Sequence, residues 1–164
     1  EIISNNWYGI RLDSHCDNNV IYHNNFLNNA IKQVTTWFSA NVWDDGYPSG
    51  GNYWSDYGGV DFYSGPFQNV AGGDGVGDTP YFVDADNRDN YPLKSPHEYW
   101  SNPIPGDINR DTRVNYDDLF SLAVAYGSTP DKPNWNPSAD VNHDGRINYK
   151  DLYKLAINYG KTYS

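Results

Sequence analysis

Oxygen-bearing side chains recur at alternate positions in the segment DVNHDGRINYKD, which runs from Asp140 to Asp151. Asp140, Asn142 and Asp144 take the first, third and fifth positions, and Asn148 and Asp151 follow at the ninth and twelfth. Carboxylate and amide oxygens are hard donors, and a curled loop that directs six or more of them at one point suits Ca²⁺. The segment therefore predicts a calcium loop with the ligand spacing of an EF-hand.

The residues between these ligands fit the same geometry. Gly145 stands where the loop must turn sharply, Arg146 lends its backbone carbonyl, and Ile147 is expected to point into a core. An earlier segment, DINRDTRVNYDD, has the same pattern, with Val114 expected inside. Its predicted ligands are Asp107, Asn109, Asp111, the carbonyl of Arg113, Asn115 and Asp118.

The two segments belong to a longer internal duplication with an offset of 33 residues. NYDDLFSLAVAYG at 115–127 matches NYKDLYKLAINYG at 148–160. Apolar residues at i, i+3, i+4 and i+7 predict an amphipathic helix after each loop, and Gly127 and Gly160 are expected to end these helices. So small a module is expected to need its metals to fold. The positions expected in the core are Leu119, Leu122, Tyr126, Leu152, Leu155 and Tyr159.

Three features depart from an ordinary EF-hand. The twelfth position is Asp rather than Glu in both loops, so each loop must close more tightly. Thr112 stands where the second loop has Gly145, and a β-branched residue resists positive φ. Prolines precede both loops, so no regular helix is expected before either. The unit is therefore a loop followed by a helix, and the second loop is expected to be the better formed.

The combination of two such loops, missing entering helices, Asp at the twelfth position and a twofold repeat resembles a type I dockerin over about residues 104–163. The resemblance implies a non-catalytic, extracellular or cell-surface module that holds two Ca²⁺ and binds a cohesin module on a scaffold or surface protein. It also implies a partner-binding face made of Tyr116, Asp117, Ala123, Val124, Tyr149, Lys150, Ala156 and Ile157. Asp117 and Lys150 differ in charge, so the two repeats are not expected to bind equivalently.

Charge and composition divide the chain. Residues 1–106 hold 13 acidic and 4 basic residues, a net charge of −9, and residues 107–164 hold 8 and 7, a net charge of −1. The total of −10 argues against nucleic acid as a partner, and no apolar run is long enough to cross a membrane. The single cysteine, Cys16, is expected to be structural. The domains predicted are a β module at 1–98, a linker at 99–106 and a dockerin at 107–163 with repeats at 107–127 and 140–160.

Residues 1–35 are rich in asparagine, and the pairs Asn5-Asn6 and Asn24-Asn25 align in a repeat of about twenty residues. Asn tolerates left-handed turns and can stack in ladders between coils, so the pattern favours a parallel β-helix. Residues 36–95 are rich in Gly, Tyr, Trp and Asp. They are expected to be mostly loops that close the end of the β-helix as an aromatic cap.

The runs GNYWSDY (51–57), GDGVGDTPY (73–81) and DNYPLK (89–94) resemble the C-terminal end of NosD-type right-handed β-helices, over about residues 1–95. These belong to a group found in carbohydrate-binding proteins and sugar hydrolases. The expected fold class is thus mixed, with an all-β module followed by a small α-helical dockerin. Because the chain begins with Glu1 and lacks Met, we expect it to be a piece of a longer protein.

The sequence leaves open whether the β module has chemistry of its own. Three functions are therefore compared. The favoured one is a docking module that is not itself an enzyme. The alternatives are a polysaccharide-degrading or polysaccharide-binding β-helix anchored through the dockerin, and a surface protein that uses calcium for rigidity. Acids that could hold another calcium or form a glycosidase pair, but for which turn and cap roles are favoured, are Asp74, Asp78, Asp84, Asp86 and Asp89. Aromatic residues that could stack on sugars, but for which cap packing is favoured, are Trp37, Trp43, Trp54 and Tyr57.

Overall fold

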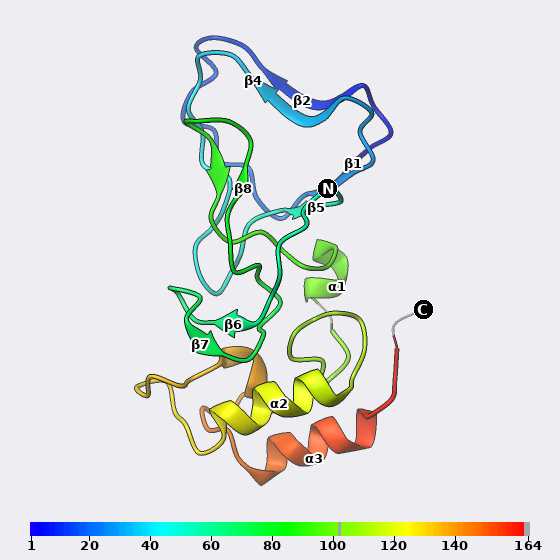
Figure 1. Cartoon of the computed structure of the whole chain (residues 1–164), viewed down its shortest axis with the longest axis vertical. Coiled ribbons are helices and arrows are strands. Elements are labelled where there is room, and N and C mark those ends of the chain that lie inside the picture. The colour runs from blue at the N-terminus through cyan, green and yellow to red at the C-terminus, as the bar shows by residue number, and fades with distance from the viewer. Residues whose placement is uncertain (102, 163–164) are drawn as a thin grey trace.

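The computed structural model describes residues 1–101 and 103–162, so parts of the linker predicted at 99–106 and of the dockerin predicted at 107–163 lie outside the described residues. Short strands fill the first part of the chain and helices the last (Figure 1). The elements are β1 (Ile2–Ser4), β2 (Tyr8–Leu12), β3 (Asn25–Leu27), β4 (Lys32–Thr36), β5 (Tyr53–Trp54), β6 (Tyr63–Ser64), β7 (Val70–Ala71), β8 (Tyr81–Phe82), β9 (Arg88–Asp89), α1 (His97–Ser101), α2 (Tyr116–Ala125), the 3-10 helix η1 (Pro137–Ala139) and α3 (Tyr149–Asn158).

The strands of residues 1–54 pair in parallel although they are far apart in sequence. β1, β3 and β5 form one sheet, in which Ile2 pairs with Asn25 and Asn25 pairs with Tyr53. β2 and β4 form a second parallel pair, with Tyr8 opposite Lys32. Two parallel strands must be joined by a long connection that brings the chain back to its starting side. Here the connections between paired strands are similar in length. β6–β7 and β8–β9 are antiparallel hairpins.

Asparagine side chains connect successive turns of this chain in columns. The backbone N–H and the Nδ2 of Asn6 both donate to Asn29 Oδ1, at 3.0 and 3.2 Å. Asn24 donates in the same way to Asn52 Oδ1, at 3.0 and 3.1 Å. The ladders predicted from the sequence are confirmed, but the alignment of Asn6 with Asn25 is wrong, because strand pairing places Asn25 opposite Ile2.

A third column continues the pattern beyond the sheets. Asn19 donates to Asn41 Oδ1 through both nitrogens at 2.9 Å, and Asn41 N–H donates to Asn87 Oδ1 at 2.9 Å. Asn5 and Asn18 adopt positive φ of 58° and 61°, as expected for left-handed turns. Within the described residues, however, the parallel strands remain separate short sheets and do not close into a continuous coil.

Aromatic rings fill the interior of this part of the molecule. Trp54 lies between Phe26, whose ring centroid is 4.3 Å away, and Tyr81, at 4.2 Å, with both pairs nearly parallel. Trp43 is fully buried beside them. The packing role predicted for Trp43 and Trp54 is therefore confirmed, whereas Trp37 is 65% exposed.

α1 lies where the prolines predicted a segment without regular helix, so that prediction is wrong for residues 97–101. Pro96 directly precedes the helix, where a missing N–H costs little because first-turn N–H groups have no helical partner. Asn25 anchors the helix to β3. Its Oδ1 accepts from His97 N–H and its Nδ2 donates to Glu98 Oε2, both at 2.7 Å.

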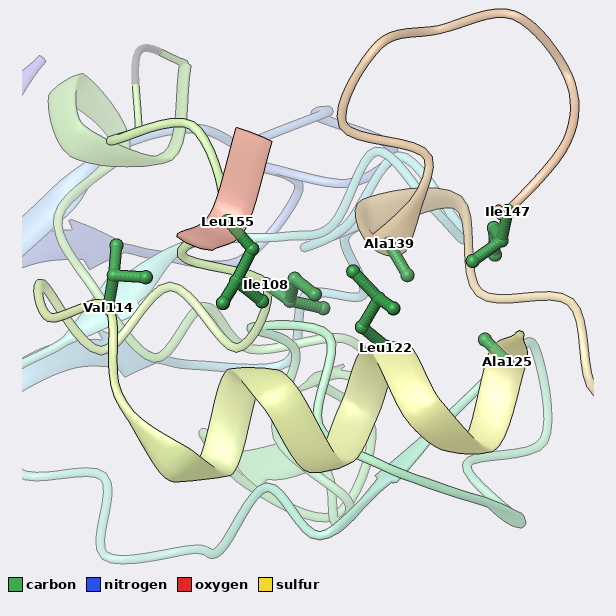
Figure 2. Packing of buried hydrophobic residues seen from close by; sticks show 7 residues of the cluster. All are labelled: Ile108, Val114, Leu122, Ala125, Ala139, Ile147 and Leu155. Carbon is green, nitrogen blue, oxygen red and sulfur yellow. The ribbon is translucent and has the colours of Figure 1, made fainter. Parts of the chain in front are cut away.

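α2 and α3 lie side by side at the end of the molecule opposite β2 and β4 (Figure 1). Both predicted helices are confirmed, and Gly127 and Gly160 follow them with φ of 80° and 83°. Figure 2 shows the apolar side chains that meet above α2. This core consists of Ile108, Val114, Leu122, Ala125, Ala139, Ile147 and Leu155. In the described part of the chain, no helix has the length and apolar character needed to span a bilayer.

Candidate functional site

The second acidic segment forms a tight loop held by its own side chains. Asp140 accepts hydrogen bonds from the N–H groups of Asp144, at 3.1 Å, and Gly145, at 2.9 Å. Asn142 Oδ1 accepts from Asp144 N–H at 2.8 Å, and Asp144 Oδ1 accepts from Arg146 N–H at 3.1 Å. Alternate oxygen-bearing side chains thus curl the backbone around themselves.

The first segment repeats these bonds. Asp107 Oδ1 accepts from Asp111 N–H at 3.1 Å, and Asn109 Oδ1 accepts from the same N–H at 3.2 Å. Asp111 Oδ1 accepts from Arg113 N–H at 2.9 Å. The duplication in sequence is therefore a duplication in local conformation.

Both loops turn through left-handed residues at equivalent places. Arg110 and His143, at the fourth position, have φ of 54° and 60°. Thr112 and Gly145, at the sixth, have φ of 77° and 76°. The sharp turn predicted at Gly145 is confirmed, and Thr112 adopts it as well, at the steric cost that a β-branched residue carries there.

The aspartate at the twelfth position joins the two ends of each loop. Asp118 is fully buried. Its Oδ1 accepts from Ile108 and Asn109 N–H, at 2.6 and 3.2 Å, and its Oδ2 accepts from Asn115 N–H at 2.8 Å. Asp151 does the same, accepting from Asn142 and Asn148 N–H at 3.1 and 2.9 Å.

The same aspartates complete capping boxes that the sequence reasoning missed. Asn115 is the N-cap of α2 and Asp118 its third residue, and each side chain bonds the backbone of the other. Asn148 and Asp151 repeat this at α3. The spacing N-x-x-D before an apolar run was the available signal. The ninth and twelfth loop positions therefore start a helix as well as carrying oxygen donors.

Val114 and Ile147 point inward, as predicted, and tie each loop to the opposite repeat. Val114 N–H donates to Lys161 O at 3.0 Å, and Gly160 N–H donates back to Val114 O at 2.8 Å. Ile147 O accepts from Gly127 N–H at 2.8 Å and Ile147 N–H donates to Ser128 O at 3.1 Å, in the segment that follows α2. Figure 2 places both side chains in the shared core. The two loops therefore fold as one unit.

The donor set of each loop suits a hard cation. Three carboxylates, two amide oxygens and one backbone carbonyl occupy the spacing that calcium loops use. Across residues 1–101 and 103–162, however, no three His, Cys, Asp or Glu side chains converge as a metal cluster. The carboxylates instead accept backbone N–H groups. The chemistry of the donors fits Ca²⁺.

Electrostatics distinguish the two loops. Burial raises the pKa of Asp107 to about 7, and the neighbouring Asp118 and Asp111 charges act in the same direction. Burial also raises the pKa of Asp118 to about 6. In the second loop, a 3.0 Å hydrogen bond from Lys150 Nζ lowers the pKa of Asp144. The first loop thus crowds carboxylates, whereas the second has a cation beside them.

A contact from outside the loops reaches the first of them. Tyr99 of α1 is buried, and its hydroxyl donates to Asp107 Oδ2. The same hydroxyl accepts from Ile104 N–H at 3.4 Å. No local pattern in the sequence predicted a role for Tyr99, because the turn at Gly106 is what brings Asp107 to it. α1 thereby joins the first loop to the strands before it.

The residues that the dockerin resemblance implies as a partner-binding face lie mostly on the surface. Tyr116 and Tyr149 are 66% and 68% exposed, and Ile157 is 57% exposed. Val124 is half-buried and is therefore less exposed than Ile157, its counterpart in the second repeat. The remaining exposed members are Asp117, Ala123, Lys150 and Ala156.

Three residues expected in the core are on the surface instead. Tyr126 and Tyr159 are 49% and 54% exposed, and Leu152 is 37% exposed. Each tyrosine is the C-cap of its helix and has an extended backbone. The helix therefore ends one residue before the tyrosine, and the tyrosine side chain does not lie on the buried face. Leu122 and Leu155 are buried as predicted, and Leu119 is partly buried.

Four of the five acids between residues 74 and 89 accept backbone N–H groups, in line with the turn and cap roles favoured from the sequence: Asp74, Asp78, Asp84 and Asp89. Asp78 accepts from Phe62 and Tyr63 N–H, and Asp84 accepts from the N–H groups two and three residues on. Asp89 is fully buried and accepts from Asn52 N–H, Trp54 Nε1 and Tyr91 N–H. Asp74 bonds Gly65 and Val76 N–H.

Comparison with known proteins assigns the region that carries the loops. Residues 105–158 match the dockerin type I domain. Part of the chain is similar to a solved structure described as a type II cohesin–dockerin domain from Bacteroides cellolosolvens, with 38% identity over 37% of this chain and 92% of that chain and a TM-score of 0.32. No curated protein matches the chain significantly. Residues 105–158, with their duplicated loop and helix, therefore form a dockerin type I domain.

Proposed function

We propose that residues 107–163 dock a longer parent protein onto a cohesin module of a scaffold or surface protein in a calcium-dependent manner. The observation that carries this proposal is the duplication: both repeats combine the six-donor pattern, the same curled loop and a helix with an exposed face. A dockerin is a non-catalytic module, so the role of this part of the chain is attachment. That role places the parent protein outside the cell or on its surface.

Two Ca²⁺ ions are part of the proposal, one in each loop. The ligands would be the oxygens of Asp107, Asn109, Asp111, Arg113, Asn115 and Asp118, and of Asp140, Asn142, Asp144, Arg146, Asn148 and Asp151. When bound, a calcium ion supplies a positive centre that joins the start of each loop to the start of its helix. The buried carboxylates at the twelfth position already make this connection through N–H groups.

Calcium titration of the full chain, followed by calorimetry and by far-ultraviolet circular dichroism, tests the metal sites. We expect two ions per chain, one after Asp107→Ala or Asp140→Ala, and none in the double variant. Asp131→Ala is the matched control, because Asp131 is exposed and lies between the repeats. A stoichiometry of two in the double variant would contradict the ligand assignment.

A panel of cohesin domains, immobilised and probed with the full chain, tests the partner. Binding is expected in calcium, and it should be lost in EDTA and in the Asp107→Ala, Asp140→Ala double variant. If calcium binds with the expected stoichiometry but no cohesin does, the chain uses calcium for rigidity and the docking function is wrong. Retained cohesin binding in EDTA would remove the metal from the mechanism.

For the preceding residues, we propose the C-terminal end of a right-handed parallel β-helix of the NosD type, with residues 36–95 as its cap and residues 99–106 as the connection. The parallel pairing of β1, β3 and β5 and the asparagine columns support this. In a structure of the parent protein, a further parallel strand should pair with the open edge of β1. An antiparallel neighbour there would contradict the proposal.

One observation favours saccharide binding as a second function of this part. Trp37, Arg11 and Asp13 line a surface pocket of about 150 Å³, with the Arg11 guanidinium 5.8 Å from the Trp37 ring centroid. Arg11 Nε donates to Asp13 Oδ1 at 3.0 Å, so the polar groups are paired and neutral overall. Because residues 1–106 carry a net charge of −9, a neutral sugar suits the pocket better than an acidic one.

Affinity electrophoresis in gels containing neutral or acidic polysaccharides tests the saccharide site. We expect retardation in a neutral polysaccharide that is lost in Trp37→Ala. Trp7→Ala is the control, because Trp7 is 75% exposed but does not line the pocket. Equal retardation of both variants would show that the pocket has no part in binding.

A further inference from the structure

The first aspartate of each loop is held by a different kind of donor. In both loops its Oδ1 accepts from the N–H group at the fifth position, at 3.1 Å. In the second loop, Asp140 Oδ2 accepts from the N–H of Gly145 at 2.9 Å. In the first loop, Asp107 Oδ2 accepts from the hydroxyl of Tyr99, which lies in α1 and outside the duplication. A side chain of α1 therefore takes the place that a loop N–H group has in the second repeat.

The hydroxyl of Tyr99 is fixed by the segment that leads into the loop. The residue is 3% exposed, and its own N–H donates to Pro96 O at 2.9 Å. The hydroxyl accepts from Ile104 N–H at 3.4 Å, and Ile104 O accepts from Asp107 N–H at 2.9 Å. The tyrosine is thus bonded both to the first residue of the loop and to the turn before it.

Gly106, between this turn and the loop, leaves the chain little freedom. It has a φ of 99°, a conformation for which glycine is suited. A Cβ built on Gly106 would lie 2.6 Å from Leu155 Cα, so the backbone passes directly against α3. The approach of Asp107 to Tyr99 is therefore determined by close packing.

α1 is attached to the strands at its other end. Asn25 of β3 is buried, and its Oδ1 accepts from His97 N–H while its Nδ2 donates to Glu98 Oε2, both at 2.7 Å. Figure 1 shows α1 between the strands and the two long helices. A continuous series of contacts therefore connects β3, through α1, with the first predicted calcium ligand of the first loop.

Other contacts hold the cap and the dockerin together without Tyr99. Gly72 approaches α2 so closely that a Cβ there would lie 3.0 Å from Ser121 Cα. Asn136 Nδ2, in the segment before the second loop, donates to Gly73 O at 3.3 Å. Removal of a single hydroxyl should therefore release one carboxylate without separating the two parts of the molecule.

The bond from Tyr99 has the character of an interaction that orients a metal ligand. A carboxylate oxygen that accepts one hydrogen bond keeps a second lone pair for a cation. Groups that hydrogen-bond a ligand hold it in the orientation that the metal needs, and their loss typically lowers metal affinity by about ten- to hundredfold. A buried hydroxyl at the first position of the loop fits this role.

We propose that Tyr99 is a positioning residue for calcium in the first loop, through which α1 and β3 raise the affinity of that loop alone. In the second loop the corresponding bond comes from Gly145, so its affinity does not depend on α1. Because coupling between sites is reciprocal, calcium in the first loop also strengthens the attachment of α1 to the dockerin. The inference rests on the calcium sites proposed above and makes the first of them depend on residues that precede the dockerin.

Tyr99→Phe tests the assignment, because it keeps the buried ring and removes only the hydroxyl. In the isotope-labelled full chain, at calcium concentrations set by a chelator, the amide resonances of Thr112 and Gly145 report the two loops separately. We expect the affinity of the first loop to fall by about tenfold and that of the second to stay unchanged. An unchanged first loop would overturn the proposal, and so would equal losses in both loops, which are the result of general destabilisation.

Tyr57→Phe is the matched control. Its hydroxyl donates to Thr79 O at 2.6 Å, within the β module, so its removal should change neither calcium affinity. A loss at the first loop as large as that of Tyr99→Phe would contradict a specific role for Tyr99.

Glu98→Ala tests the connection to β3. Glu98 is exposed, and the change removes one of the two bonds between α1 and Asn25. We expect a loss at the first loop that is smaller than that of Tyr99→Phe, and none at the second. A first loop that Glu98→Ala leaves unchanged would show that β3 has no part in positioning Asp107.

Hydrogen exchange of the Tyr99 amide measures the reciprocal effect without a calcium titration. Calcium should slow its exchange in the wild-type chain but not in Tyr99→Phe, because only the wild-type hydroxyl connects α1 to the loop. Exchange that calcium leaves unchanged in the wild type would contradict the coupling.

The outcomes also distinguish the inference from the function on which it rests. If the wild-type chain binds no calcium, the proposed function fails and the inference with it. If it binds two ions and Tyr99→Phe binds both as tightly, only the inference fails. Neither measurement requires a cohesin, so a chain that binds calcium but no cohesin still tests the role of Tyr99.

Discussion

At the scale of single residues, the two loops differ at one backbone position. Thr112 and Gly145 have nearly the same φ, 77° and 76°, but only glycine adopts this conformation without steric cost. A Cβ built on Gly145 would meet nothing within 4 Å, so any penalty there is conformational and not one of crowding. The first loop therefore stores strain that the second lacks.

We expect Thr112→Gly to stabilise the first loop by about 1 kcal/mol and to raise its calcium affinity by about fivefold. Gly145→Ala should weaken the second site by a similar factor. Calorimetric calcium titrations of the full chain measure both. Gly46→Ala, another left-handed glycine with open space around it, serves as the control outside the loops. Unchanged affinities would mean that the turn is not strained when calcium binds.

A second residue-scale prediction concerns Asp89. Burial raises its pKa to about 7, although three N–H groups favour the carboxylate. The unfolded value is about 3.9, so the folded state holds a proton that the unfolded state has lost between these values. The stability that this proton contributes is complete below about pH 4 and is lost as the pH rises through 7.

The unfolding midpoint of the aromatic core, followed by near-ultraviolet circular dichroism, should therefore fall between pH 5 and pH 8 more steeply in the wild-type chain than in Asp89→Asn. Asp13→Asn, at a side chain 60% exposed, should leave the slope unchanged. Parallel curves for wild type and Asp89→Asn would show that Asp89 does not titrate in this range.

At the scale of elements, periodicity identified both helices but not all of their buried positions. Leu122 and Leu155 are buried at 1% exposure, as the spacing predicted. Tyr126 and Tyr159 are exposed because each helix ends one residue before them. Leu152 is exposed because α3 packs on α2 with only one of its faces. A helical pattern indicates which residues share a face, but not how much of that face a neighbouring element covers.

Leu155→Ala should destabilise the dockerin by about 2–5 kcal/mol, because it leaves a cavity in the core shown in Figure 2. Leu152→Ala on the same helix should cost under about 1 kcal/mol, because its side chain is 37% exposed. Urea unfolding in saturating calcium, followed by helical circular dichroism, compares the two. Equal costs would contradict the packing of α3.

At the scale of the whole molecule, the contacts between residues 72–74 and the dockerin predict that removal of calcium also lowers the protection of residues outside the loops. Segment-resolved hydrogen exchange should show lower protection of residues 107–118 and 140–151 in EDTA than in calcium. Residues 72–75 should lose protection too, because they rest on α2 and η1. Residues 25–54 should be unaffected.

The Asp107→Ala, Asp140→Ala chain is the control for that measurement, since calcium should no longer change any of these segments. Protection that changes uniformly along the chain would mean that the metal acts on global stability alone. Protection that changes in the loops but not at residues 72–75 would show that the two parts of the molecule are not coupled.

The sequence alone determined the features that depend on residue types and their spacing along the chain. The oxygen spacing of the loops, the helices behind them and the duplication of both follow from such patterns, and the asparagine pairs predicted ladders but not which asparagines meet. Tertiary structure decided which distant residues meet: the column register that pairs Asn6 with Asn29, the contact of Tyr99 with Asp107, and the burial of Ser121 but not Lys154. Such contacts depend on strand register and on close packing between separate segments, which local spacing does not encode. That is why two nearly identical repeats present two different surfaces.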